Sequence, residues 1–238
     1  MQAESDCSTV IRGRSAISWR WLCRVALGAS GLVMSVWLLA PGIRALLQGG
    51  PLLTMDTQLA TWVRAGMASQ AFAQFMRWLS LLHGTAGILA MTALAAAALW
   101  RTGDREWALA LGVTVCGGLL LNVTVKHVVH RARPDWGHAL ETLESFSFPS
   151  GHTAGATVFY GMAAAWLWPR LGSAWARTAL LFATVGMVLL VATSRIARGM
   201  HFPSDCIAAL LEMSLWLTVC LAGIPLRHAA SPLTHNPP

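Results

Sequence analysis

Long apolar runs constrain this chain more than any other feature of its sequence. The runs are roughly 20 residues each, the length that an α-helix needs to cross about 30 Å of hydrocarbon. They account for a composition that is 55% hydrophobic, with a mean hydropathy of +0.56 and 11% charged residues. Soluble domains do not have this composition, so the sequence predicts an integral membrane protein made of α-helices.

We expect an all-α fold in which six transmembrane helices form one bundle over residues 25–224. The expected spans are 25–40, 78–100, 107–125, 153–168, 178–193 and 205–224. Pro41 and Gly42 would begin the connection after the first span, and residues 169–177 would form a basic loop. Connections this short leave no room for a soluble domain.

Three segments outside the spans have their own predictions. A helix at 55–68 would lie along the membrane interface, with Asp56, Thr57 and Arg64 on its polar side. Residues 1–24 would be a cytoplasmic segment and 225–238 a C-terminal tail. A cleavable signal peptide is the alternative to a retained first span, but LLAPGIR lacks a convincing small-residue cleavage site.

The net charge of +7 suits anionic lipid surfaces, and nothing in the sequence resembles a nucleic-acid module. With the N-terminus inside, nine Lys and Arg residues face the cytoplasm and eight face the other side. Five of those eight lie in two polar stretches, and without them the count is nine against three, as the positive-inside rule expects. Both polar stretches would then lie at the outer face.

These stretches, 126–152 and 194–205, contain three short motifs. Lys126 and Arg133 form K-x6-RP, and such cations are costly at a membrane boundary without anionic partners. Snorkelling from a helix end would explain Lys126 alone equally well. In PSGH, Ser150 can cap the next helix, whose free N–H groups form an anion site; a plain helix start is the alternative.

The third motif is SR-x5-H-x3-D, in which His201 and Asp205 are four residues apart. At this spacing the carboxylate can accept the Nδ1–H of the imidazole and fix its tautomer. The neutral Nε2 is then free to attack phosphorus. The motifs together predict a phosphate-binding catalytic site.

In this order the three motifs resemble the signature of the type 2 phosphatidic acid phosphatase family, membrane lipid phosphate phosphatases related to vanadium haloperoxidases. The resemblance implies that His201 forms a phosphohistidine, that Asp205 orients it, and that His152 protonates the leaving oxygen. It implies phosphate binding by residues of all three motifs, namely Lys126, Arg133, Ser150, Gly151 and Arg195. It also implies catalysis without a metal or cofactor, and the sequence shows no obvious Mg²⁺ or Zn²⁺ ligand pattern.

Glu212 lies seven residues beyond Asp205 on the same helix face, about 10 Å deeper in the membrane. An acid at that depth indicates function by default. We expect it to support the site through Asn122, one turn before Lys126. The alternative is a neutral packing residue.

The sequence therefore predicts an enzyme that hydrolyses a lipid phosphate or diphosphate in a bacterial inner membrane, with its active site outside. Undecaprenyl diphosphate, phosphatidylglycerol phosphate, phosphatidate and lipid A phosphate all fit the resemblance, and the short first connection favours polyprenyl diphosphate or a broad range. Two alternatives stay open. One is phosphoryl transfer to another lipid, and the other is a protein that binds or transports anionic lipids without catalysis.

Overall fold

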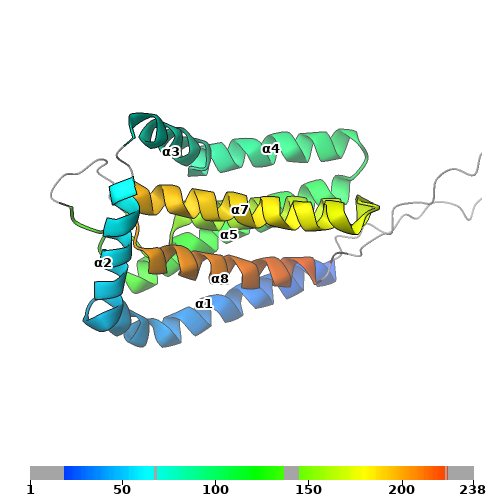
Figure 1. Cartoon of the computed structure of the whole chain (residues 1–238). Helices are drawn as coiled ribbons and strands as arrows, with labels where there is room; N and C mark the ends of the chain where they lie inside the picture. Colours follow the sequence, from blue (N-terminus) through cyan, green and yellow to red (C-terminus); the bar gives the residue numbers. More distant parts are fainter. Residues whose placement is uncertain (1–18, 67–68, 137–144, 223, 225–238) are drawn as a thin grey trace, which may run out of the picture.

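The computed structural model describes residues 19–66, 69–136, 145–222 and 224. The predictions for residues 1–18 and 225–238 lie outside this part of the chain. Within it, every regular element is a helix and no strand is present. The longest helices run side by side in alternating directions and form one bundle (Figure 1). The predicted all-α fold is confirmed.

Eight α-helices and one short 3₁₀ helix make up the described chain. They are α1 (Trp19–Leu47), α2 (Gly50–Ala65), α3 (Gln70–Leu82), α4 (Thr85–Arg101), α5 (Arg105–Val129), α6 (Gly151–Leu167), η2 (Trp168–Arg170), α7 (Ala174–Ala197) and α8 (Pro203–Leu221). Four helices, α1, α5, α7 and α8, are long and apolar enough to cross a membrane, and α3 with α4 would add a fifth, bent span. With α6 at 17 residues, the count of six spans stays a prediction.

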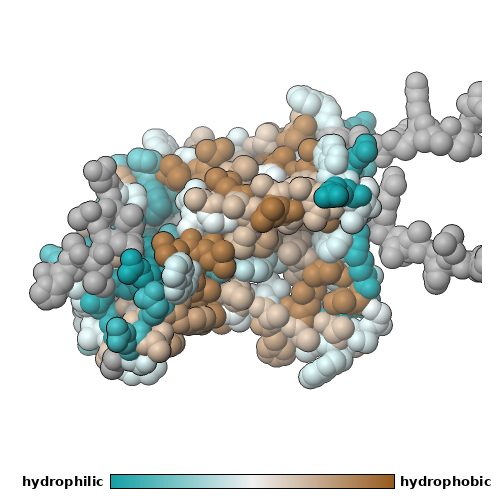
Figure 2. All heavy atoms as spheres, turned by 90° about the horizontal axis from the view of Figure 1, so that it is seen from above, coloured by the Kyte–Doolittle hydropathy of each residue, from teal (hydrophilic) through white to brown (hydrophobic). Residues whose placement is uncertain are grey.

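The outer surface of the bundle has the polarity of a membrane protein. Hydrophobic residues form a broad zone across its middle, and hydrophilic residues gather towards its two ends (Figure 2). Large apolar side chains such as Leu94 and Phe182 are each 73% exposed. Exposed apolar area on this scale is favourable in contact with lipid chains and unfavourable in contact with water. The chain is an integral membrane protein.

Two predicted helix boundaries are wrong. Pro41 and Gly42 lie inside α1 and do not begin a connection. Proline removes one hydrogen bond from the helix, but its fixed φ is helical, and α1 continues for six residues beyond it. The basic loop at 169–177 is shorter than predicted because Ser173 caps α7, where its side chain accepts a hydrogen bond from the Ala176 N–H.

The predicted second span, 78–100, is not one straight helix. It breaks between α3 and α4, whose axes differ by 60°. His83 ends α3, and its Nδ1 lies 2.8 Å from the Leu79 carbonyl oxygen, where it competes for an intrahelical acceptor. Gly87 permits the bend, because a Cβ there would lie 1.9 Å from the Leu82 carbonyl oxygen. A run of apolar residues fixes the length of a helix but not its direction.

Helix α6 is the centre of the bundle and packs against α4, α5, α7 and α8. Its sequence is rich in small residues, which let neighbouring helices approach closely. A Cβ at Gly161 would lie 2.4 Å from a methyl group of Leu217 on α8, so a larger residue there would force the leucine side chain to move. Because α6 is enclosed, its N-terminus is held on several sides.

Helix α2 lies across one end of the bundle, nearly perpendicular to the other helices (Figure 1). This arrangement agrees with the predicted interfacial helix, which was placed at 55–68. Asp56, predicted on the polar side of this helix, faces polar groups of the protein, and its side chain is only 3% exposed. Asp56 is buried because it binds groups on α8 and on the segment after α5.

Candidate active site

The two polar stretches meet at one end of the bundle, the end that α2 covers (Figure 1). Lys126 is in the last turn of α5, and Arg195 is in the last turn of α7. Gly151 and His152 begin α6, and Asp205 is in the first turn of α8. Alternating helix directions therefore bring all three motifs together.

His201 lies in the short connection between α7 and α8 and is 2% exposed. Its Nδ1 is 3.5 Å from Asp205 Oδ2, at the outer limit for a hydrogen bond, and its Nε2 is 3.4 Å from Arg133 Nη1. Burial lowers the pKa of His201 to about 4, although the Asp205 carboxylate acts in the opposite direction. The imidazole is therefore neutral at physiological pH, as a nucleophile must be.

Asp205 is fully buried and makes three short contacts besides the long one to His201. Oδ1 accepts a hydrogen bond from Arg131 Nη1 at 2.6 Å. Oδ2 accepts one from the Ser147 hydroxyl and one from the Phe202 N–H at 2.9 Å. The last contact caps α8, so the helix start itself holds the carboxylate beside His201.

Three cations border His201, and each of them hydrogen-bonds to neutral groups. Lys126 Nζ donates to the Phe146 carbonyl oxygen at 2.8 Å. Arg133 Nη1 donates to the Met200 carbonyl oxygen at 2.7 Å, and Arg195 Nη1 donates to the Ser80 hydroxyl. None of the three forms a salt bridge within the described residues.

These cations are also close enough to repel one another. Burial and the absence of a carboxylate partner make such a cluster costly unless an anion neutralises it. Lys126 is 8% exposed and Arg195 is 2% exposed, so solvent screens them little. Their arrangement is that of a binding site for a multiply charged anion such as phosphate.

The PSGH motif adopts the predicted cap. The side chain of Ser150 accepts a hydrogen bond from the Thr153 N–H, and α6 begins at Gly151. A Cβ at Gly151 would lie 3.4 Å from Asn122 Oδ1, so the glycine keeps the backbone close to α5. His152 follows, and a Cβ at Gly84 would lie 3.6 Å from its Nε2, so its imidazole is near the break between α3 and α4. Motif residues from both polar stretches thus gather at one end of the bundle.

The predicted support pair also comes together. Asn122 Nδ2 donates to Glu212 Oε2 at 3.4 Å, and Asn122 Oδ1 lies close to Gly151. The second carboxyl oxygen of Glu212 is buried without a partner. Asn122 therefore links Glu212 to Gly151. A supporting role for the pair stays a proposal.

Sequence reasoning missed two residues of this site, Arg131 and Asp56. Arg131 is 2% exposed and donates to Asp205 through Nη1 and to Asp56 Oδ2 through Nη2, at 2.8 Å. Asp56 also accepts from the Ser204 N–H at 3.0 Å. The motifs do not include either residue. Two signals were available, namely a carboxylate on a largely apolar helix and an arginine in excess of the motif.

A metal centre has no obvious place in this part of the chain. Among the described residues, no three His, Cys, Asp or Glu side chains gather where they could hold a metal ion. The acidic groups of the site within these residues are already bound: Asp56 and Asp205 to Arg131, and Glu212 to Asn122. The positive charge at the site comes from side chains.

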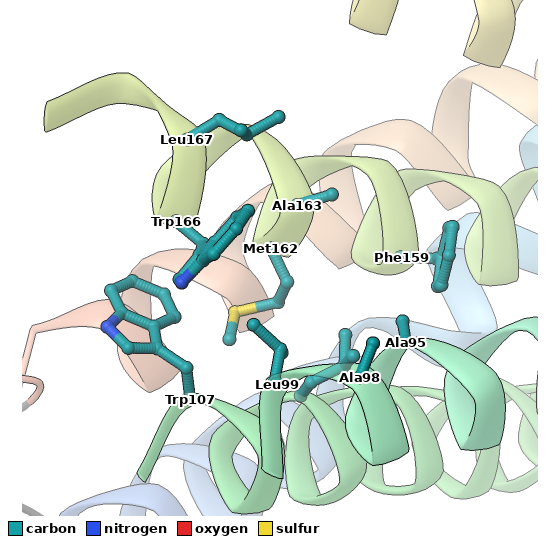
Figure 3. Close-up of a pocket in the computed structure, with 10 residues that line it drawn as sticks. Ala95, Ala98, Leu99, Trp107, Phe159, Met162, Ala163, Trp166 and Leu167 are labelled. Atoms are coloured by element: carbon teal, nitrogen blue, oxygen red, sulfur yellow. The ribbon is translucent and has the colours of Figure 1, made fainter. Parts of the chain in front are cut away.

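A separate cavity of about 220 Å³ lies between α4, α5 and α6 (Figure 3). Apolar side chains line it, including Leu99, Trp107, Phe159 and Met162. Trp166 borders it and donates through Nε1 to Asp104, just before the start of α5, whereas Lys126 is in the last turn of that helix. The cavity is therefore at the opposite end of the bundle from His201 and has no catalytic groups.

Comparison with known proteins agrees with this geometry. The sequence model of the PAP2 superfamily matches residues 107–228, which include every motif residue. Phosphatidylglycerophosphatase B of Bacillus subtilis (strain 168) is 34% identical over 87 residues, 36% of this chain and 42% of that relative. The chain thus matches less than half of the relative's length.

A solved structure extends the likeness to most of the fold. It is the crystal structure of a transmembrane PAP2-type phosphatidylglycerolphosphate phosphatase from Bacillus subtilis. The match has a TM-score of 0.69 at 21% identity and covers 80% of this chain and 94% of the other. At that identity the likeness shows the fold alone.

Proposed function

The chain belongs to the PAP2 superfamily, and on this premise we propose that it hydrolyses a lipid phosphate through a phosphohistidine at His201. The observation that carries the proposal is the 3.4 Å contact between Arg133 Nη1 and His201 Nε2, inside a group of three cations without carboxylate partners. A phosphate held by these cations would present its phosphorus to Nε2. The resemblance found in the motifs is confirmed at the level of the family.

The first chemical step is in-line attack by the Nε2 lone pair on phosphorus. A P–N bond forms, the P–O bond to the lipid breaks, and His152 donates a proton to the leaving oxygen. Asp205 stabilises the positive charge that develops on the His201 ring. Lys126, Arg133 and Arg195, with the free N–H groups of α6, would stabilise charge on the equatorial oxygens.

The second step restores the enzyme. His152, now neutral, takes a proton from a water molecule that attacks phosphorus on the side opposite His201. The P–N bond breaks, inorganic phosphate forms, and the electron pair returns to Nε2. No step requires a metal ion, because the three cations supply the positive charge that Mg²⁺ would supply in a metal-dependent phosphatase.

The substrate class follows from the relatives and from the position of the pocket. The curated relative and the solved structure are both phosphatases of phosphatidylglycerol phosphate. These relatives support phosphatidylglycerol phosphate as the first substrate to test, ahead of the polyprenyl diphosphate that the sequence analysis favoured. Phosphatidate and lipid A phosphate complete the panel to test. We place the pocket at the outer face of a bacterial inner membrane, where the positive-inside count puts it.

Phosphate release by detergent-purified protein, measured with EDTA present, tests the proposal. We expect release from at least one lipid of the panel, and no release above background from His201→Ala. His127→Ala is the matched control, because His127 is exposed at the same end of the bundle and packs against Phe146.

Trapping the intermediate makes the test specific. A lipid labelled with ³²P should leave acid-labile, base-stable label on the protein, and His201→Ala should lose it. Release that EDTA abolishes, or that survives in His201→Ala, would refute the mechanism. Label that passes to an added lipid acceptor faster than to water would identify a phosphotransferase.

A further inference from the structure

Ser80 is a buried serine near the end of α3 that no motif includes. It is 2% exposed and lies at the bend between α3 and α4. Its hydroxyl accepts a hydrogen bond from Arg195, a cation of the site. We propose that Ser80 is a positioning residue that holds the phosphate-binding guanidinium of Arg195 in a fixed orientation.

The hydroxyl contact fixes Arg195. Arg195 Nη1 donates to Ser80 Oγ, and this is the one hydrogen bond that the guanidinium makes within the described residues. Its Nε is buried without a partner, and no carboxylate pairs with it there. The planar guanidinium binds phosphate well only when its orientation is set. In the described chain, that orientation depends on Ser80.

The bend itself is tied to the helix that bears His152. His83 Nε2 lies 2.9 Å from the Tyr160 hydroxyl on α6. Gly84 stays close to the imidazole of His152, since a Cβ there would lie 3.6 Å from His152 Nε2. The α3–α4 bend that positions Ser80 therefore lies beside His152 as well.

The inference rests on the proposed function and predicts a defined pattern of kinetics. Ser80→Ala removes the hydroxyl and leaves Arg195 Nη1 unpaired, so kcat/KM should fall about tenfold or more. Ser80→Thr keeps a hydroxyl and should restore most of the activity. Thr114→Val is the control, because it removes a buried hydroxyl on α5 that makes no hydrogen bond to the described residues of the site.

A double-mutant cycle separates positioning from a general loss of packing. Arg195→Ala and Ser80→Ala/Arg195→Ala should have the same kcat/KM, because Ser80 acts through Arg195. Equal fold-losses from Ser80→Ala with and without Arg195 would overturn the inference. So would full activity in Ser80→Ala, or an equal loss in Thr114→Val.

Binding of inorganic phosphate, measured by calorimetry on the intact protein, tests the contact between Ser80 and Arg195 without turnover. We expect Ser80→Ala to weaken phosphate binding and Ser80→Thr to retain it. If the wild-type protein releases no phosphate from any lipid, the proposed function fails while this measurement still tests Ser80. Unchanged phosphate affinity in Ser80→Ala would refute the positioning role.

Discussion

Arg131 and Arg133 are two residues apart in the sequence, yet the structure puts them in opposite electrostatic surroundings. Arg131 is enclosed by Asp56 and Asp205, and both of its terminal nitrogens donate to carboxylates. Arg133 donates to the neutral oxygens of Ser145 and Met200. The comparison teaches that the partners of a cation decide its role: Arg131, with two carboxylates, orders the protein, and the half-buried Arg133, with none, is available to an anionic ligand.

The largest effect should come from removing the paired cation. Arg131→Met would leave Asp56 and Asp205 buried without their cation, at a cost of about 3–5 kcal/mol of unfolding free energy. Thermal unfolding in detergent should show a markedly lower Tm, with activity lost because Asp205 is no longer held. An unchanged Tm would show that the network is not structural.

Removing Arg133, the cation without a carboxylate partner, should lower the activity and not the stability. Arg133→Ala deletes a donor to the transition state, which costs about 3 kcal/mol or about 100-fold in kcat. Its Tm should stay level or rise, because one of three mutually repelling cations is gone. A large fall in Tm would mean that Arg133 and Arg131 do not differ in role.

The pH dependence of kcat/KM tests the effect of Arg133 and Asp205 on His201. Its folded pKa of about 4 lies below the usual 6.5 because of burial, with Lys126 and Arg133 also disfavouring protonation and Asp205 favouring it. The acid limb of kcat/KM should therefore have a midpoint near pH 4 and move to higher pH in Arg133→Ala. The stability that neutral His201 contributes is present above pH 6.5 and is lost as pH falls from there towards 4. An acid limb near 6.5 would contradict the enclosure of His201.

The smallest effect should come from an ion pair at the opposite end of the bundle. Arg170 Nη2 lies 2.8 Å from Asp104 Oδ2, and the two side chains are 32% and 33% exposed. Water screens such a pair, so Arg170→Ala should change the unfolding free energy by about 0.5 kcal/mol and leave kcat/KM unchanged. A loss comparable to that of Arg131→Met would show that exposure does not separate the two ion pairs.

Much of the site could be predicted because its residues stand in short motifs at helix ends. Lys126, Arg133, Ser150 and His201 are recognisable from spacing, and alternating helix directions are enough to bring the motifs to one end of the bundle. The pairing of Asn122 with Glu212 was also predicted from helix periodicity, and the structure shows that contact. Local spacing is thus sufficient for these residues.

The rest depended on contacts between distant segments. Asp56 hydrogen-bonds to Ser204, which is 148 residues away in the sequence, and Ser80 hydrogen-bonds to Arg195, which is 115 residues away. No periodicity links such residues, because each contact is decided by how helices pack. The direction change at His83 was missed for a related reason, since the apolar run continues through it. Hydropathy predicts the length of a membrane-spanning segment, but not the point at which its helix changes direction.

The Asp56–Arg131–Asp205 network has a consequence for how the protein is made. Its three members come from α2, from the segment after α5, and from α8, so synthesis delivers them one at a time in that order. When Arg131 has been synthesised and α8 has not, the nascent chain contains the cation and only Asp56 of its two carboxylate partners. Catalytic competence should therefore appear abruptly, when the final helix enters the membrane.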